Sequence, residues 1–223
     1  MDYDGCMSQK KSEYEAFAEL FSSTRSKLTR WPELDFVLPY LRPDAQVLDV
    51  GCGNGRARQF LGRDIVNKGN WQGIDISKKL INVARERHTG DKWTVGDMTK
   101  KLPMEDNSVD VIIALASFHH ILSKAEQKRA IAEYHRVLRN GGVVFITTWA
   151  LPKKYFWGNV LRGRWKNFII PFGPEKIPRT YRRVSDIELK NLLQSGGMTV
   201  LTRGLTYHNS GDARNYFAVA RKG

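Results

Sequence analysis

The segment VLDVGCGNG, residues 47–55, joins a short apolar run to three glycines at alternate positions. The apolar run is typical of a buried strand, and the glycines let the backbone turn tightly and approach a ligand closely. A dinucleotide-binding fingerprint would read GxGxxG and would place a pyrophosphate at a helix N-terminus. Here the glycines follow GxGxG and Asp49 precedes them. The segment therefore disfavours a pyrophosphate and favours a ligand with a cationic amino-acid part.

Beyond this segment, short apolar runs alternate with amphipathic ones up to residue 150. Strands are expected at 71–76, 92–97, 108–116 and 141–150, and helices near 55–62, 78–88 and 123–139. This alternation predicts an α/β fold, in which helices cover both faces of a parallel sheet. At 223 residues, the chain is expected to form one domain.

The ends of the expected strands carry acidic residues in a regular order. In doubly wound sheets, ligands bind at the carboxyl ends of the strands. Asp75 ends the second strand, twenty residues after Gly55, where a carboxylate can hold ribose hydroxyls. Asp97 ends the third strand, and Met98 beside it offers an apolar contact for a purine ring. A single such Asp is more often a solvated carboxylate, but three strand ends that agree in order and spacing predict a nucleoside-containing ligand.

These motifs, with RVLRNGGVVFITTW at 136–149, resemble those of the class I S-adenosylmethionine-dependent methyltransferases and follow the order of that family. The resemblance covers roughly residues 44–150. It implies a Rossmann-like, seven-stranded sheet with helices on both faces and the last strand antiparallel. It also implies S-adenosylmethionine as the methyl donor and cofactor.

The resemblance assigns donor-binding roles by position. The glycine turn would wrap the amino-acid part of the donor, Asp75 would hold the ribose, and Asp97 with Met98 would contact the adenine. The end of the fourth strand would lie beside the methionine part. The cofactor-binding residues implied are Asp49, Gly51, Cys52, Gly53, Asn54, Gly55, Asp75, Ile76, Asp97, Met98, Ala114, Leu115 and Ala116.

The single domain, 1–223, divides into four parts of different composition. We expect an N-terminal helical cap (1–43), a cofactor-binding core (44–150), a basic aromatic insertion (151–180), and a C-terminal helix and hairpin (181–223). The insertion breaks the alternation of strands and helices with four prolines and few aliphatic runs. We place it over the upper edge of the sheet.

Both ends of the chain add helices to the core. In the cap, helices are expected at 9–21 and from Trp31 to about Leu41. Near the C-terminus, Ser185 is the expected N-cap of a helix and Glu188 completes its capping box. Two strands then close the chain.

A narrower resemblance lies outside the core. FSSTRSKLTRWP at 21–32, ASFHHI at 116–121, RTYRRVSDIEL at 179–189 and RNYFAVARK at 214–222 are similar to the tRNA wobble-uridine methyltransferases. Those enzymes esterify a carboxymethyl group on uridine 34, and a similar domain occurs in the AlkB-type tRNA-modifying protein. The matching residues are Arg25, Trp31, His119, His120, Arg179, Tyr181 and Glu188.

The same resemblance implies partners and shows two departures. It implies tRNA as the substrate and, for many members, a small zinc-binding activator subunit. The family usually has a Tyr-His pair followed two residues later by an aromatic residue. Here Arg182 follows Tyr181, and Val184 takes the place of the aromatic residue.

The charge of the chain also indicates a polyanionic partner. Lys and Arg number 36 and Asp and Glu 23, which gives a net charge of +13. Nucleic acid is the first candidate partner and an acidic membrane surface the second, although a basic chain can also be merely soluble. Residues 151–190 hold ten basic and three acidic side chains. Cations interleaved with aromatic rings can neutralise phosphates and stack on unpaired bases. The aromatic residues there are Tyr155, Phe156, Trp157, Trp165, Phe168, Phe172 and Tyr181.

The two adjacent histidines raise the question of a catalytic base. A carboxylic acid, with a pKa of about 4, is already ionised near neutral pH, so a carboxylate acceptor needs no base. A hydroxyl or amine acceptor would gain roughly 100- to 10,000-fold from one. The tRNA interpretation therefore predicts that Arg25, His119, Arg179 and Tyr181 position the substrate, and that His120 is structural. No metal site is predicted.

Two rival functions stay open at this stage. A small-molecule methyltransferase of the same fold, acting on a quinone or lipid precursor, would need an apolar lid instead of a basic one. A non-catalytic RNA-binding protein could also have kept the fold. The polar N-terminus and the presence of only two cysteines, Cys6 and Cys52, favour a cytoplasmic location.

Overall fold

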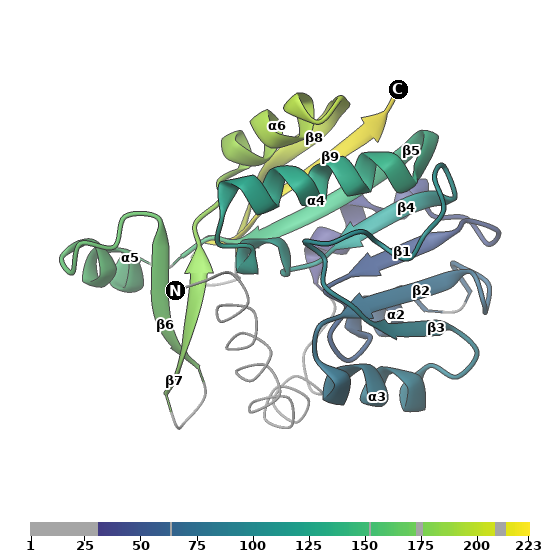
Figure 1. Ribbon diagram of the computed structural model, residues 1–223, viewed down its shortest axis with the longest axis horizontal. Coiled ribbons are helices and arrows are strands. Elements are labelled where there is room, and N and C mark those ends of the chain that lie inside the picture. Colours follow the sequence, from purple (N-terminus) through teal and green to yellow (C-terminus); the bar gives the residue numbers. More distant parts are fainter. Residues whose placement is uncertain (1–30, 63, 152, 173–175, 208–212) are drawn as a thin grey trace.

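The computed structural model describes residues 31–62, 64–151, 153–172, 176–207 and 213–223. Its centre is a seven-stranded sheet in the order β3-β2-β1-β4-β5-β9-β8 (Figure 1). The strands are β1 (Val47–Val50), β2 (Trp71–Asp75), β3 (Lys92–Val95), β4 (Val109–Ala114), β5 (Leu138–Trp149), β8 (Met198–Tyr207) and β9 (Ala213–Lys222). Strands β1 to β5 pair in parallel, whereas β9 is antiparallel to both β5 and β8. The predicted Rossmann-like α/β fold, with its last strand antiparallel, is confirmed.

Strand β1 shows why short apolar runs form the middle of this sheet. Leu48 and Val50 are buried in the hydrophobic cluster on one face, and Val47 is buried in the cluster on the other. Because successive side chains point to opposite faces, a strand covered on both sides needs apolar residues at nearly every position. Asp49 is the exception, and it lies near the carboxyl end of the strand.

Helices cover both faces of the sheet, as predicted. On one face, α4 (Lys124–Val137) and α6 (Asp186–Ser195) contribute Ile131 and Leu192 to the core. On the other, α2 (Arg56–Leu61) and α3 (Lys78–Arg87) contribute Leu61 and Ala84. Within the described ranges, no helix is long and apolar enough to cross a bilayer.

The N-terminal cap differs from its prediction. In place of one helix from Trp31 to Leu41, the chain forms two short 3₁₀ helices, η1 (Pro32–Phe36) and η2 (Leu38–Tyr40). Pro39 has no N–H to donate within a helix, and it disfavours the helical conformation of the residue before it. The helix predicted at 9–21 and the side chain of Arg25 lie outside the described residues.

The segment after β5 forms its own small unit. It consists of α5 (Lys153–Val160) and a two-stranded antiparallel sheet, β6 (Asn167–Phe172) with β7 (Ile177–Arg182). Figure 1 shows this unit projecting beside the carboxyl ends of the central strands. A third cluster, which includes Phe168, Ile170 and Tyr181, packs between its elements.

Helix α6 follows this unit and begins as predicted. The Ser185 hydroxyl accepts a hydrogen bond from the Glu188 N–H (3.2 Å). The Glu188 carboxylate accepts from Arg182 at 3.5 Å. Glu188 therefore ties the start of α6 to β7.

Candidate functional site

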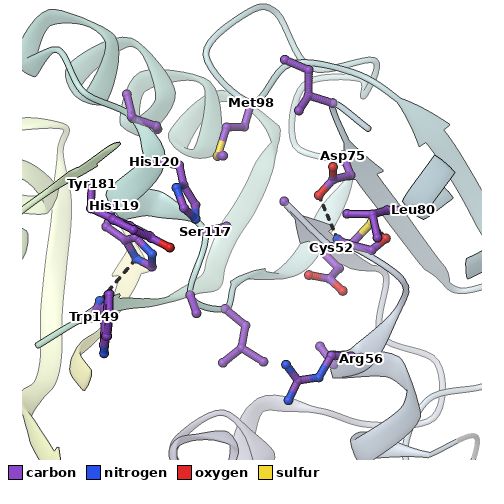
Figure 2. Close-up of a pocket in the computed structure, with 18 of the residues that line it drawn as sticks. Cys52, Arg56, Asp75, Leu80, Met98, Ser117, His119, His120, Trp149 and Tyr181 are labelled. Carbon is purple, nitrogen blue, oxygen red and sulfur yellow. Dashed lines mark hydrogen bonds between the residues drawn. The ribbon is translucent and has the colours of Figure 1, made fainter. Parts of the chain in front are cut away.

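A cavity of about 320 Å³ lies at the carboxyl ends of β1, β2 and β4 (Figure 2). Most of the predicted site residues line it: Asp49, Gly51, Cys52, Gly53, Asp75, Ile76, Asp97, Met98, Leu115, Ala116, His119, Arg179 and Tyr181. Asn54, Gly55 and Ala114 are buried outside its wall. The side wall is completed by the small unit after β5, which contributes Ile170 and Pro171.

The glycine turn forms one wall of the cavity. Gly51 and Gly53 both have positive φ angles, 69° and 55°, which favour glycine. A Cβ at Gly51 would also collide with the side chain of Ser117. The N–H groups of Gly51 and Cys52 donate to the carbonyl of Ile74 at 2.7 and 3.0 Å, which fastens the turn to β2. Only glycine fits this close approach of the backbone.

Asp75, the last residue of β2, is held rigidly at the cavity. Its Oδ2 accepts from the Gly53 N–H and its Oδ1 from the Ser77 N–H, both at 2.9 Å. Each carboxylate oxygen has a second lone pair. Asp75 can therefore still accept hydrogen bonds from a ligand in the cavity.

Two carboxylate oxygens at this end of the cavity are buried without a hydrogen-bond partner among the described residues. They are Oδ2 of Asp49 and Oδ2 of Asp97. The other oxygen of Asp97 accepts from both the N–H and the hydroxyl of Thr99 at 2.8 Å. Buried polar atoms are nearly always satisfied in proteins, so these two oxygens indicate a ligand with hydrogen-bond donors at two points.

Charge supports this interpretation of Asp49. Burial raises the pKa of Asp49, and the like charge of Asp75 raises it further. Burial and the same two carboxylates also raise the pKa of Cys52. The thiol is therefore neutral and forms a small apolar part of the wall. A cationic group on the ligand would relieve the repulsion between Asp49 and Asp75.

The two histidines lie on the opposite wall, in the 3₁₀ turn η3 (Phe118–His120). Ala116 just before the turn has a positive φ of 50°, uncommon for a residue other than glycine. Its N–H donates to the Thr147 hydroxyl at 2.7 Å, which fixes the turn against β5. Both His119 and His120 line the cavity, including His120, for which the sequence predicted a structural role.

His119 is held as a neutral donor. The Trp149 backbone N–H donates to its Nδ1 at 3.3 Å, so the ring proton lies on Nε2. Burial, together with the positive charge of Arg179, lowers the pKa of His119 to about 3. A ring that stays neutral at physiological pH can donate one hydrogen bond from Nε2.

His120 and Arg179 meet beside it. Arg179 Nη2 lies 3.2 Å from His120 Nε2. A guanidinium has no acceptor, so Arg179 donates and the His120 proton lies on Nδ1. The Tyr181 ring lies 5.3 Å from that of His119 and 4.9 Å from that of His120, and its centroid lies 5.2 Å from Arg179 Cζ. Two histidines, a tyrosine and one arginine thus surround this end of the cavity.

The two departures from the wobble-uridine pattern lie away from the cavity. Arg182 donates to the Leu122 carbonyl (3.3 Å) and pairs with Glu188. Val184 is fully buried, and its carbonyl accepts from the Thr148 hydroxyl at 2.6 Å. Both residues fasten β7 and α6 to the core, and neither lines the cavity.

Several lining residues were not predicted from the sequence. Arg56, at the start of α2, has its Cζ 4.4 Å from the Trp31 ring centroid. Arg214 approaches the same ring at 5.6 Å, and its Nε pairs with buried Glu33 at 3.2 Å. The position of Arg56 just after the glycine turn was its only signal in the sequence. Trp31 was named only as a family match, and the other residues missed are Thr99, Ser117, Trp149 and Asn215.

Comparisons with protein families and curated proteins give relatives of one kind. A family model described as a methyltransferase domain matches residues 48–146. A tRNA (carboxymethyluridine(34)-5-O)-methyltransferase of Arabidopsis thaliana is 36% identical over 141 residues, which are 63% of this chain and 32% of that protein. A human protein named "Probable tRNA methyltransferase 9B" is 32% identical over 157 residues, 69% of this chain and 32% of that protein. The chain thus spans about a third of the length of these relatives.

Solved structures agree on the fold. An S-adenosylmethionine-dependent methyltransferase from Methanosarcina mazei has a TM-score of 0.71 at 21% identity, covering 87% of this chain and 99% of that one. A methyltransferase solved in complex with the Trm112 activator of Haloferax volcanii has a TM-score of 0.69 at 19% identity, covering 96% of this chain and 98% of that one. At these identities, the likeness shows the fold alone.

Proposed function

The chain contains a class I S-adenosylmethionine-dependent methyltransferase domain, and we propose that it methylates a carboxylate carried by tRNA. The product would be the methyl ester of a carboxymethyl group on the wobble uridine. The names of the curated relatives support this choice of substrate, and the wall of the cavity around His119 supports the choice of a carboxylate.

The residues at one end of the cavity fit the donor. The buried oxygen of Asp49 suits the ammonium group of the donor's methionine part, and the carboxylate of Asp75 suits the ribose hydroxyls. The buried oxygen of Asp97 suits the adenine amino group, with Met98 against the ring. S-adenosylmethionine supplies an activated methyl group on a sulfonium.

The observation that carries the proposal is the state of His119. Its Nδ1 accepts a hydrogen bond, and its pKa of about 3 leaves it neutral, with Nε2–H as a donor. A ring with so low a pKa is a poor general base at neutral pH. Beside it, Arg179 supplies a permanent positive charge. This wall therefore suits an acceptor that is already an anion.

A carboxylate acceptor matches the chemistry that such a wall allows. A carboxylate oxygen attacks the methyl carbon, the bond from that carbon to sulfur breaks, and sulfur keeps the electron pair. No proton is transferred. The contribution of His119 and Arg179 is to hold the acceptor in line with the methyl group. Tyr181 limits where the acceptor can lie.

The outer surface of the small unit supports a tRNA substrate. Trp157 and Trp165 are 59% and 69% exposed, and Arg162, Arg164 and Lys166 lie among them. Exposed rings and cations together bind unpaired nucleotides. Because β7 also places Arg179 and Tyr181 in the cavity wall, RNA bound to this surface would bring a nucleotide to the cavity.

Two further features belong to the proposal. A neighbour in fold is solved with a Trm112 activator, so we include a small activator subunit as a partner. We place the activity in the cytoplasm, where tRNA is used.

The test is methyl transfer from labelled donor to total tRNA, first treated with mild alkali so that existing esters become carboxylates. We expect label in a modified uridine, released as methanol by a second alkali treatment, with or without added activator. Label that resists alkali would contradict a carboxylate acceptor. Absence of tRNA labelling under both conditions, from a protein that binds the donor, would contradict the tRNA substrate.

A further inference from the structure

The guanidinium of Arg56 forms part of the cavity floor. Arg56 is 6% exposed and begins α2 directly after the glycine turn. Its Cζ lies 4.4 Å from the Trp31 ring centroid and 5.4 Å from that of Phe60. Figure 2 shows it below Cys52, away from the histidines. A cation is therefore built into the donor end of the cavity, separate from Arg179 at the acceptor end.

The other arginine on this floor has a different role. Arg214 pairs with Glu33, which is fully buried and also accepts from Thr206 and Asn215. These contacts join the start of the N-terminal segment to the β8–β9 hairpin. Trp31 lies between Arg214 and Arg56, so this network holds the ring against which Arg56 packs.

The charges at this end of the cavity match a zwitterion. Asp49 presents a buried carboxylate oxygen with no hydrogen-bond partner among the described residues, and Arg56 presents a guanidinium to the same cavity. An α-amino acid carries an ammonium and a carboxylate on one carbon. A guanidinium is the side chain best suited to a carboxylate, because its planar fork of N–H groups matches the two oxygens.

We propose that Arg56 binds the α-carboxylate of the methyl donor while Asp49 binds its α-ammonium group. This subsite rests on the proposed donor site but not on the identity of the acceptor. The product S-adenosylhomocysteine keeps the same amino-acid end, so Arg56 holds donor and product alike. Such uniform binding lowers KM and leaves kcat nearly unchanged.

The experiment compares two ligands by calorimetry: S-adenosylmethionine and its decarboxylated form, which keeps the amine but lacks the carboxylate. The parent should bind the complete donor roughly 10- to 100-fold more tightly. Arg56→Met should lose most of this preference by weakening only the complete donor. Arg56→Lys should retain part of it, and the surface variant Arg164→Met should retain all of it.

Asp49→Asn provides the internal comparison. It should weaken both ligands by a similar factor, because both carry the amine. If Arg56→Met weakens both ligands equally, Arg56 only shapes the cavity and the proposal is wrong; if it weakens neither, Arg56 does not contact the donor. A thermal unfolding curve for each variant separates loss of binding from loss of folding. A tRNA substrate could fail and these binding ratios would still hold, whereas a parent that binds neither ligand would contradict the donor site itself.

Discussion

The backbone N–H of Trp149, at the end of β5, donates to Nδ1 of His119 at 3.3 Å. This one bond decides which nitrogen of the ring carries the proton, and it directs the remaining N–H to the cavity. Burial and the charge of Arg179 lower the pKa of the ring and keep it neutral. The vicinal histidines are thus supports for an anionic acceptor, provided that the proposed function holds.

The first prediction separates a positioning histidine from a base. His119→Gln keeps an N–H donor near the Nε2 position but cannot titrate, so we expect it to retain activity within about tenfold of the parent, well short of the loss of roughly 100-fold or more that removal of a base causes. The parent's single-turnover rate on tRNA should be flat from about pH 6 upward, because the pKa of His119 is about 3. A rate that rises with pH between about 6 and 7 in the parent, and is flat in the variant, would mean that His119 is a base.

The second prediction concerns the cation of the acceptor wall. Arg179→Met removes a charge-assisted hydrogen bond to the acceptor, worth about 1.5–3 kcal/mol, so kcat/KM on tRNA should fall by roughly 10- to 100-fold. Donor affinity should stay the same, since Asp49 and Asp75 are untouched. Arg183→Met is the matched control, because Arg183 lies over Phe156 and outside the cavity. Equal losses in the two variants would show that Arg179 acts only through the overall charge of the surface.

The third prediction concerns the exposed cations of the small unit. Replacing Arg162, Arg164 and Lys166 together by alanine should reduce the slope of log affinity for tRNA against log salt by about 0.7–0.9 for each phosphate that the variant no longer neutralises. Filter binding over a salt series measures this slope. An unchanged slope would show that these charges only solvate the surface, and unchanged donor affinity is the control for folding.

The fourth prediction uses the repulsion at Asp49. Burial and Asp75 raise its pKa, so the charged form opposes folding and stability is lost as the pH rises through that pKa. Asp49→Asn should therefore stabilise the ligand-free protein at pH 7, by about 1 kcal/mol or more. It should also lose most of the stabilisation that saturating S-adenosylmethionine gives the parent. Urea unfolding with and without donor measures both, and a ligand-free variant less stable than the parent would contradict the assignment.

Much of the fold could be predicted because each central strand carries its own signal. Apolar residues at successive positions of β1 and β4, followed by turns, indicate strands buried on both faces. The cap could not be predicted as well. The apolar residues around Leu34 and Val37 suggest one helix, but Pro39 cannot continue it, and 3₁₀ turns take its place. The start of α6 was predictable from Ser185, because the cap is a local contact.

The site divides in the same way. Asp49, Asp75 and Asp97 were predictable because parallel strands end at one edge of the sheet. Arg56 and Arg214 were not, because packing against Trp31 brings together residues far apart in the chain. Gly55 shows the converse limit: a Cβ there would lie 2.6 Å from His88, so this glycine serves packing behind the turn and lies outside the cavity wall.

The last prediction turns the state of His119 into a measurement of stability. The pKa falls from an ordinary 6.5 to about 3 in the folded protein. Between these values the unfolded chain binds a proton that the folded protein does not. Folding stability should therefore fall as the pH falls below 6.5, by about 1.4 kcal/mol per pH unit from this group alone.

His119→Gln removes that dependence. The loss of unfolding free energy between pH 7 and pH 5, measured in urea, should be smaller in the variant than in the parent by about 2 kcal/mol. His135→Gln is the matched control: partial burial and Lys222 also lower the pKa of His135, but His135 lies outside the cavity, and its replacement should change the pH dependence less. If the parent and His119→Gln lose the same free energy over this range, His119 is protonated in the folded protein. The neutral donor on which the carboxylate proposal depends would then not exist.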